Sequence, residues 1–273
     1  MALEFIFPVA AAVLALTVFV VGDRVRPESW RQTGDEASGT LVLDLIKTFF
    51  TAVVAFVVVI CWQQYQNAHN HTVAESKALV DTYLAAQELP EADRQQVQGL
   101  LRAYTDQVVS GEWAVMDAEG KLSPATQDTF DTLRASVTAV SSSDTATSDT
   151  RAAALAGLDQ VAQARHDRAV DAGRGVPGFL YLALFFGTLL LLFSPVLSGL
   201  RVTKRSVAMT ALLGVVVGAA VLAIHNLDRP FSGGNVVPRD AYEYAQTRFE
   251  QIGGRWANSA PATAIGAGDV PHR

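Results

Sequence analysis

Histidine and carboxylate side chains lie close together at one place in this sequence, where they could bind a metal ion. His71 and Glu75 are four residues apart, so a helix would present both on one face, and His69 comes just before them. Two histidines and one carboxylate are few ligands for a metal, and no His-Glu-x-x-His pattern accompanies them. We therefore interpret these residues as a solvated helix face and expect neither a metal nor a cofactor.

An acid and a base, Asp44 and Lys47, stand near the beginning of a long apolar run. Their three-residue spacing lets them pair on one helix face, which lowers the cost of placing either charge near lipid. One interpretation is an interfacial ion pair that fixes the tilt of a spanning helix. The other is a charged ring beside an ion path, followed by a hydrophobic neck that gates by dewetting. The residues able to line that neck are Phe49, Phe50, Val53, Phe56 and Val57.

A second charged pair, Asp228 and Arg229, follows another apolar run and precedes Pro230, Phe231 and Gly233. Proline cannot continue a helix, so this segment is predicted to end one, with Arg229 reaching the lipid headgroups. Arg229 is also predicted to meet acidic groups of the polar segment described below and to tie the chain end to it. The alternative is an ion-binding or gating cluster at a pore mouth.

Four further charged residues, Glu75, Glu112, Arg165 and Arg168, are spread over a polar segment. Arg165 or Arg168 would be a natural partner for Glu75 or Glu112, so we predict ion pairs that hold helices together. Catalysis has no comparable support, because the sequence lacks a glycine-rich phosphate loop and a Gly-x-Ser-x-Gly elbow. We predict that the protein is not an enzyme.

The elements that must position these residues are apolar runs arranged as two pairs. They cover Phe5 to Val21, Leu41 to Trp62, Val176 to Leu197, and Val207 to Ile224. Each run is close to the ~17 to 25 residues that a helix needs to cross the hydrocarbon core of a bilayer. The sequence therefore predicts an all-α, multi-pass integral membrane protein with four transmembrane helices, located in the cell membrane with the lipid bilayer as its partner.

The predicted domains are residues 1–62 with transmembrane helices 1 and 2, an extra-membrane helical module at 63–175, residues 176–226 with helices 3 and 4, and a C-terminal tail at 227–273. No proline or glycine occurs between Leu41 and Pro90, so one helix of ~70 Å, at ~1.5 Å per residue, is predicted to run from the second span into the module. The Ser/Thr/Asp stretch from Ser141 to Asp149 is predicted to be a flexible loop.

The chain end after the fourth span is predicted to contain one short outer helix, Val236 to Ile252, with Tyr242, Tyr244 and Phe249 as anchors. The residues from Gly253 to Arg273, rich in Gly, Ala and Pro, are predicted to be disordered.

Charge excludes some partners and bears on orientation. Lys and Arg number 21 against 27 Asp and Glu, and no basic cluster occurs, so nucleic acid is an unsuitable partner. The single cysteine, Cys61, excludes an intramolecular disulfide.

The two short connections carry Arg24, Arg26, Arg31, Arg201, Lys204 and Arg205. Because short basic loops stay in the cytoplasm, the module is predicted to face outward.

Landmarks along the chain match a known family in order. They are Glu75, Tyr83, Leu84 and Leu89-Pro90, then Arg94, Tyr104, Val108 and Glu112-Trp113, then Arg165, Arg168 and Pro177, and last Leu227 to Gly233. With these landmarks, over about residues 1 to 250, the chain resembles the bestrophin-like membrane proteins of bacteria and plants.

This resemblance implies a distant similarity to bestrophins, pentameric anion channels with four spans. It thus implies a homo-oligomer and an inorganic anion as partners, and it implies a cytoplasmic module, opposite to the orientation that the basic loops predict. The alternative function is a non-conducting membrane protein whose outer module binds a partner or senses the state of the envelope.

Overall fold

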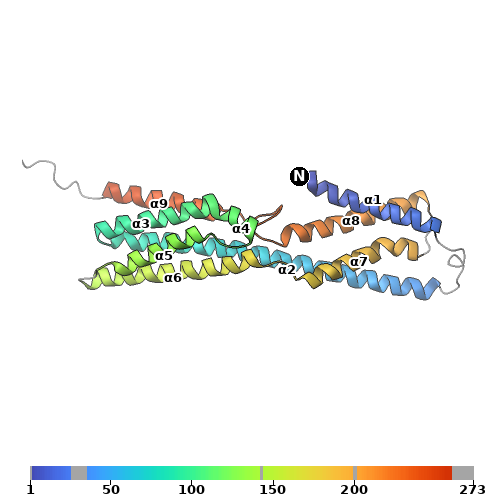
Figure 1. The fold of residues 1–273 in the computed structure, drawn as a ribbon, viewed down its shortest axis with the longest axis horizontal. Coiled ribbons are helices and arrows are strands. Elements are labelled where there is room, and N and C mark those ends of the chain that lie inside the picture. Colours follow the sequence, from blue (N-terminus) through green and yellow to red (C-terminus); the bar gives the residue numbers. More distant parts are fainter. Residues whose placement is uncertain (1, 26–35, 142–143, 199–201, 260–273) are drawn as a thin grey trace, which may run out of the picture. The chain divides into compact units, whose positions relative to one another are not determined.

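The computed structural model describes residues 2–25, 36–141, 144–198 and 202–259 (Figure 1). Within these ranges every regular element is a helix, so the all-α prediction is confirmed. Three basic residues used above for orientation, Arg26, Arg31 and Arg201, lie outside the described residues, as does the part of the predicted disordered tail from 260 to 273.

The chain forms two compact units. The first contains Met1–Ala68 and Asp171–Val237, and the second contains His69–Val170 and Pro238–Arg273. The C-terminal segment predicted as one tail is divided between the two units. Residues 227–237 belong to the first unit, and the helix after them belongs to the second.

The first unit consists of α1 (Ala2–Val25), the first part of α2 (Glu36–Ala85), α7 (Gly178–Leu197) and α8 (Lys204–Leu227). Each contributes a stretch long and apolar enough to cross a membrane, which agrees with the four predicted spans. In Figure 1, α1 and α8 lie side by side along their lengths. A capping box begins α8. The Thr203 side chain accepts a hydrogen bond from the Ser206 N–H, and the Ser206 side chain accepts one from the Thr203 N–H.

The core of this unit is apolar and joins three helices. Phe50, Val57 and Cys61 of α2 pack with residues of α7 and α8, among them Leu184 and Val217. Two glycines permit the close approach. A Cβ on Gly214 of α8 would lie 2.6 Å from the Cα of Ala12 in α1, and one on Gly187 of α7 would overlap the ring of Phe50.

The second helix, α2, is continuous over 50 residues, so the predicted run-through helix is confirmed. Its early residues belong to the first unit and its later residues to the second. A three-residue 3₁₀ turn, Ala86–Glu88, ends it, and Pro90 then precedes the next helix.

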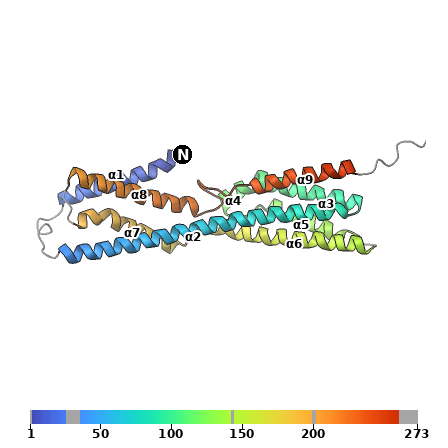
Figure 2. The same ribbon diagram turned by 180° about the vertical axis from the view of Figure 1, so that it is seen from behind.

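The second unit is an antiparallel helical bundle built on the later part of α2 (Figure 2). Its other helices are α3 (Glu91–Gln107), a π-helical turn (Val108–Glu112), α4 (Trp113–Glu119), α5 (Pro124–Ala139), α6 (Thr145–Gly173) and α9 (Asp240–Ser259). Ser123 caps α5 by accepting a hydrogen bond from the Thr126 N–H, and Pro124 occupies the first helical position.

The helix α9 is tied to α2 within this unit by the Ser76 hydroxyl, which donates to the carbonyl of Ala241 at 2.5 Å, and by the stacked rings of Tyr83 and Phe249. Of the three anchors predicted in α9, Tyr242 and Phe249 are buried, but Tyr244 is exposed, so the prediction for Tyr244 is wrong. It lies two positions, about 200° of helical rotation, from Tyr242.

Two boundaries also differ from prediction. The helix α6 begins at Thr145, inside the stretch predicted to be a loop, whose residues 142–143 lie outside the described part of the chain. The helix α9 extends to Ser259, past the start of the predicted disordered tail. Polar composition favoured a loop in both places, but a polar helix is stable where one face packs on a bundle.

Candidate functional site

The two arginines of α6 bring together the buried charges of the second unit. Arg165 and Arg168 are three residues apart, so both project from one face of the helix. Both are buried, and Arg168 has no solvent exposure at all. Buried charges are stable only when opposite charges and hydrogen bonds replace the water they lose.

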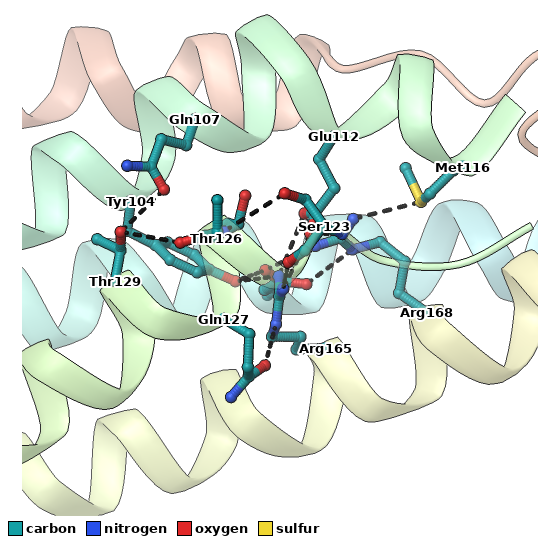
Figure 3. A network of polar contacts seen from close by, with 12 residues as sticks. Tyr104, Gln107, Glu112, Met116, Ser123, Thr126, Gln127, Thr129, Arg165 and Arg168 are labelled. Carbon is teal, nitrogen blue, oxygen red and sulfur yellow. Dashed lines mark hydrogen bonds and ion pairs between the residues drawn. The ribbon is translucent and has the colours of Figure 1, made fainter. Parts of the chain in front are cut away.

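Glu112 lies between these arginines (Figure 3). Arg165 donates to both of its oxygens, with Nη2 2.9 Å from Oε1 and Nη1 3.2 Å from Oε2. Arg168 donates from Nη2 to Oε2 at 2.8 Å. The backbone N–H of Ser123 adds a bond to Oε1 at 3.1 Å. One carboxylate therefore joins α6 to the π-helical turn and to the beginning of α5.

Glu75, on α2, is the second carboxylate of this group. Arg168 binds it in a bidentate manner, with Nε 2.9 Å from Oε2 and Nη2 3.1 Å from Oε1. The Tyr104 hydroxyl donates to Oε1 at 2.5 Å and accepts from Nη1 of Arg165 at 3.0 Å. Glu75 and Tyr104 thereby extend this group of bonded side chains to α2 and α3. We call Glu75, Tyr104, Glu112, Arg165 and Arg168 the buried charge network.

The π-helical turn positions Glu112 in this network. The inward-facing residues Tyr104, Val108, Glu112 and Met116 are each four positions apart. In an ordinary α-helix, four residues advance ~400°, so each of these side chains would rotate by ~40° relative to the one before. The wider turn at Val108–Glu112 removes part of that drift, so residues on both sides of it face the same interior.

Aromatic rings and one thioether enclose the guanidinium groups. The Cζ of Arg168 lies 5.7 Å from the ring centroids of both Trp113 and Tyr242, and the Cζ of Arg165 lies 5.5 Å from that of Tyr104. Nη1 of Arg168 is 3.5 Å from the sulfur of Met116. These contacts exclude water and strengthen the ion pairs by lowering the local dielectric constant.

Burial and charge act in opposite directions on the protonation of this network. Burial alone would raise the pKa of Glu112, but Arg168 and Arg165 outweigh it, so the pKa of Glu112 lies below its ordinary value. Burial raises the pKa of Tyr104 well above its ordinary value, and the charge of Glu75 adds to that rise. At neutral pH Glu112 is ionised and Tyr104 remains a hydrogen-bond donor.

Two carboxylates and two guanidinium groups cancel in charge, and their bonds connect four elements of one bundle. The arrangement is suited to holding the bundle rather than to binding a further ion. Glu75, one of the three residues considered above for metal binding, has its carboxylate on Arg168 and Tyr104. In the described ranges, no group of three or more His, Cys, Asp or Glu residues is arranged to hold a metal.

In the first unit, the proposed neck residues fall on two faces of α2. Phe49 and Phe56 are 72% and 64% exposed, whereas Phe50 and Val57 lie in the apolar core and Val53 packs against that core. Asp44 and Lys47 pair at 3.2 Å, as their spacing suggested. Lys47, however, is two positions from Phe49, about 200° around the helix, so the structure does not bring it together with Phe49 and Phe56.

Five of the exposed apolar residues in the spanning part of α2 are separated by alternating spacings of four and three. We call Leu45, Phe49, Ala52, Phe56 and Val59 the α2 stripe; all five are exposed. This is the heptad spacing that keeps residues on one line where helices wind around each other.

The segment after the fourth span is held by Asp228. Its carboxylate accepts hydrogen bonds from the backbone N–H of Val176 and, at 2.6 Å, from the hydroxyl of Tyr181. Phe231 is buried, and Pro230 accepts a backbone hydrogen bond from Val237 at 2.8 Å.

The other two residues of this motif behave differently. Gly233 has a φ of 91°, which favours glycine. Arg229 is exposed, and its carbonyl accepts a hydrogen bond from the Ser232 N–H at 3.2 Å. The bond predicted between its side chain and acidic groups of the outer bundle stays a prediction. Asp228 makes the connecting bonds described above.

The sequence did not predict several residues that contact the buried charge network. Gln127 accepts from Nε of Arg165 at 2.9 Å, and Ser123 and Met116 make the contacts given above. Serine, glutamine and methionine are common on helices, so residue type gave no signal. The four-residue spacing from Tyr104 to Met116 was a usable sign of the π-helical turn.

Known proteins resemble this chain in sequence family and in fold. Residues 9–242 match the family described as Bestrophin-like domain. A variant of a bacterial bestrophin homologue from Klebsiella pneumoniae has a TM-score of 0.70 at 12% identity, covering 90% of this chain and 99% of that chain. A second structure of that homologue has a TM-score of 0.66 at 13% identity, covering 89% and 97%.

A further crystal structure, described as that of a membrane protein, has a TM-score of 0.66 at 12% identity and covers 93% of this chain and 100% of that chain. At such identities the likeness shows the fold alone. No curated protein matches the sequence.

Proposed function

The chain belongs to the bestrophin-like family of integral membrane proteins, and we propose that several copies assemble in the cell membrane into a channel for inorganic anions. The α2 stripe of each copy would face the ion path, with Phe49 and Phe56 as the narrow apolar neck. The solved homologues support this proposal through their fold and their description as bestrophin homologues.

The observation that carries the proposal is the α2 stripe itself. The outer face of any helix shows spacings of three and four, because those positions share one face. What favours contact around a common axis is that two large rings, Phe49 and Phe56, repeat after seven positions, the period that keeps side chains on one line between wound helices. The stripe has that spacing, and its residues are not used in the core of their own chain.

A path through a single copy is a poor alternative. The core of the first unit is an apolar cluster of Phe50, Val57, Cys61, Leu184 and their neighbours. An ion crossing there would lose its hydration without gaining polar partners. A path between copies, along an apolar neck that wets when it opens, avoids this cost.

A second candidate function rests on a groove of the second unit. Its hollow of about 610 Å³ lies between α2 and α9 and is lined by Val73, Val80 and Leu84, with Lys77 and Arg248 among the charged residues. An apolar floor with charged edges is typical of a groove that holds a partner helix. This favours a non-conducting protein that binds a partner through its outer bundle.

Reconstitution separates the two functions. The full-length protein, purified in detergent, would be sized and then placed in liposomes for a chloride flux assay. We expect an oligomer with flux, and Phe56→Ala should change that flux by widening the neck. Phe186→Ala on α7, also exposed, is the matched control and should leave it unchanged. A monomer without flux would reject the channel and favour the partner-binding function.

A further inference from the structure

A hollow of about 380 Å³ lies between α2, α7 and α8 of the first unit, on the side of α2 away from the α2 stripe. The residues of α8 that line the hollow are three or four positions apart and begin with Ser206 and Thr210. The lining residues of α7 begin with Leu191 and Ser194. Each helix therefore presents one continuous face to the hollow.

One end of the hollow is cationic and polar. Lys47 lines it and gives one N–H to Asp44 at 3.2 Å, and among the described residues Asp44 is the one hydrogen-bond partner given for its three donors. The hydroxyl-bearing residues Ser194 and Thr210 are buried in the same wall. The first residues of α8, Lys204 and Arg205, add positive charge next to Ser206, where the helix dipole is also positive.

The rest of the hollow is apolar and continues along the span. A second hollow of about 100 Å³ shares the wall residues Thr51, Leu191, Val216 and Val217 with the first. From Ser206 to Val217 the groove follows α8 for eleven positions, or ~16 Å at ~1.5 Å per residue. This matches the depth of one bilayer leaflet, half of the ~30 Å hydrocarbon core.

The groove is open toward its surroundings at Met209 and Val216, which are 61% and 59% exposed. A ligand can therefore enter sideways from the bilayer. A free anion would fill only the polar end. A helix from a second copy would place apolar side chains against the ammonium group of Lys47, which then loses water without a counter-charge.

We propose that this groove binds one anionic phospholipid per chain. Its phosphate would lie at Lys47 and the hydroxyl groups of the polar end, and one acyl chain would lie in the apolar part between α2, α7 and α8. The inference is independent of whether the protein conducts ions. It assigns Lys47 to lipid binding, in place of the ion path considered from sequence.

The test is lipid retention by the full-length protein. Delipidated protein in detergent would be mixed with equal amounts of phosphatidylglycerol and phosphatidylcholine of identical acyl chains, and bound lipid counted by native mass spectrometry. We expect one phosphatidylglycerol per chain in clear preference. Lys47→Gln should weaken that binding about tenfold and abolish the preference, since bonds to charged groups are worth about that factor.

Two further variants separate head and chain. Leu213→Trp, which fills the groove beside Met209, should lower the binding of both lipids. Arg24→Gln removes an exposed charge of α1 that does not line the groove and should leave phosphatidylglycerol bound. Folding of each variant is checked by its melting temperature in detergent.

Competition identifies the source of the phosphate. Lysophosphatidylglycerol should displace the bound lipid, and inorganic phosphate at the same concentration should not. Displacement by inorganic phosphate alone would overturn the lipid assignment in favour of a free anion. Equal binding of both lipids by the wild type would overturn it in favour of nonspecific lipid contact. If Leu213→Trp loses its oligomers and no lipid was bound, the groove instead holds a second copy of the chain.

Discussion

Arg168 and Glu75 are 93 positions apart in the chain, yet Nε of Arg168 lies 2.9 Å from Oε2 of Glu75 with both side chains completely buried. Each side chain supplies a counter-charge and hydrogen bonds that replace the water lost by the other. The pair therefore links α2 to α6 by a contact that cannot be removed from one side alone at low cost.

We expect Arg168→Met to destabilise the protein by about 3–5 kcal/mol, because it leaves the carboxylates of Glu75 and Glu112 with one guanidinium between them. The measurement is the melting temperature in detergent. Arg134→Met is the control, since Arg134 and Asp159 form an exposed pair worth about 0–1 kcal/mol. If both variants melt alike, the network does not stabilise the bundle.

The double variant Glu75→Met with Arg168→Met should recover part of the lost stability, because it removes one charge of each sign and leaves Glu112 with Arg165. A double variant less stable than Arg168→Met alone would mean that Glu75 stabilises the fold without Arg168.

Acid should weaken the second unit through Glu112. Its pKa lies below the ordinary value of 4.5, so folding favours the ionised form. The corresponding stability is fully present above pH 4.5 and is lost as the pH falls through the lower pKa of the folded state. Melting temperatures from pH 6 to pH 3 should therefore fall more steeply for the wild type than for Glu112→Gln. Parallel curves would contradict this assignment.

Asp228→Asn should destabilise the first unit by about 1–3 kcal/mol, because an amide replaces an oxygen that accepts from the Val176 N–H or the Tyr181 hydroxyl. Tyr181→Phe removes only one of these bonds and should cost about 0.5–1.5 kcal/mol. Arg229→Ala, at the exposed neighbouring position, should change the melting temperature little. A larger effect at Arg229 than at Asp228 would reverse their roles.

Gly214→Ala should lower the stability of the helix pair α1 and α8 by about 1–3 kcal/mol, because its Cβ would meet the backbone of Ala12 and force the helices apart. Gly178→Ala is the matched control on α7, where a Cβ meets nothing within 4 Å. Equal melting temperatures for the two variants would show that α1 moves freely at this contact.

Local pattern was enough to predict the spans and the continuity of α2. Apolar runs and the absence of proline and glycine act within a few turns of helix, so they can be recognised without knowing the rest of the fold. The same local rule separates Lys47 from Phe49, because two positions turn a helix by about 200°. Grouping them by their closeness in sequence ignored that rotation.

The buried charge network could be predicted only in part. The sequence offered Glu75 and Glu112 as partners of Arg165 and Arg168, but which carboxylate meets which guanidinium depends on how four elements pack. Glu112 in fact binds both arginines. The π-helical turn and the contacts of Gln127 and Met116 arise from that packing and have no equivalent signal in residue type.

The π-helical turn separates chain length from side-chain direction in the outer bundle. Its five residues rotate the chain about as far as four residues of an ordinary α-helix, or ~400°, so the extra residue is absorbed within the turn. Deleting one residue between Val108 and Glu112 would let the segment close as an α-helix and leave Trp113 and Met116 facing the guanidinium of Arg168. A one-residue deletion elsewhere in α3 would instead rotate everything after it by ~100°, so changes in length among relatives that retain both arginines of α6 are expected at the π-helical turn.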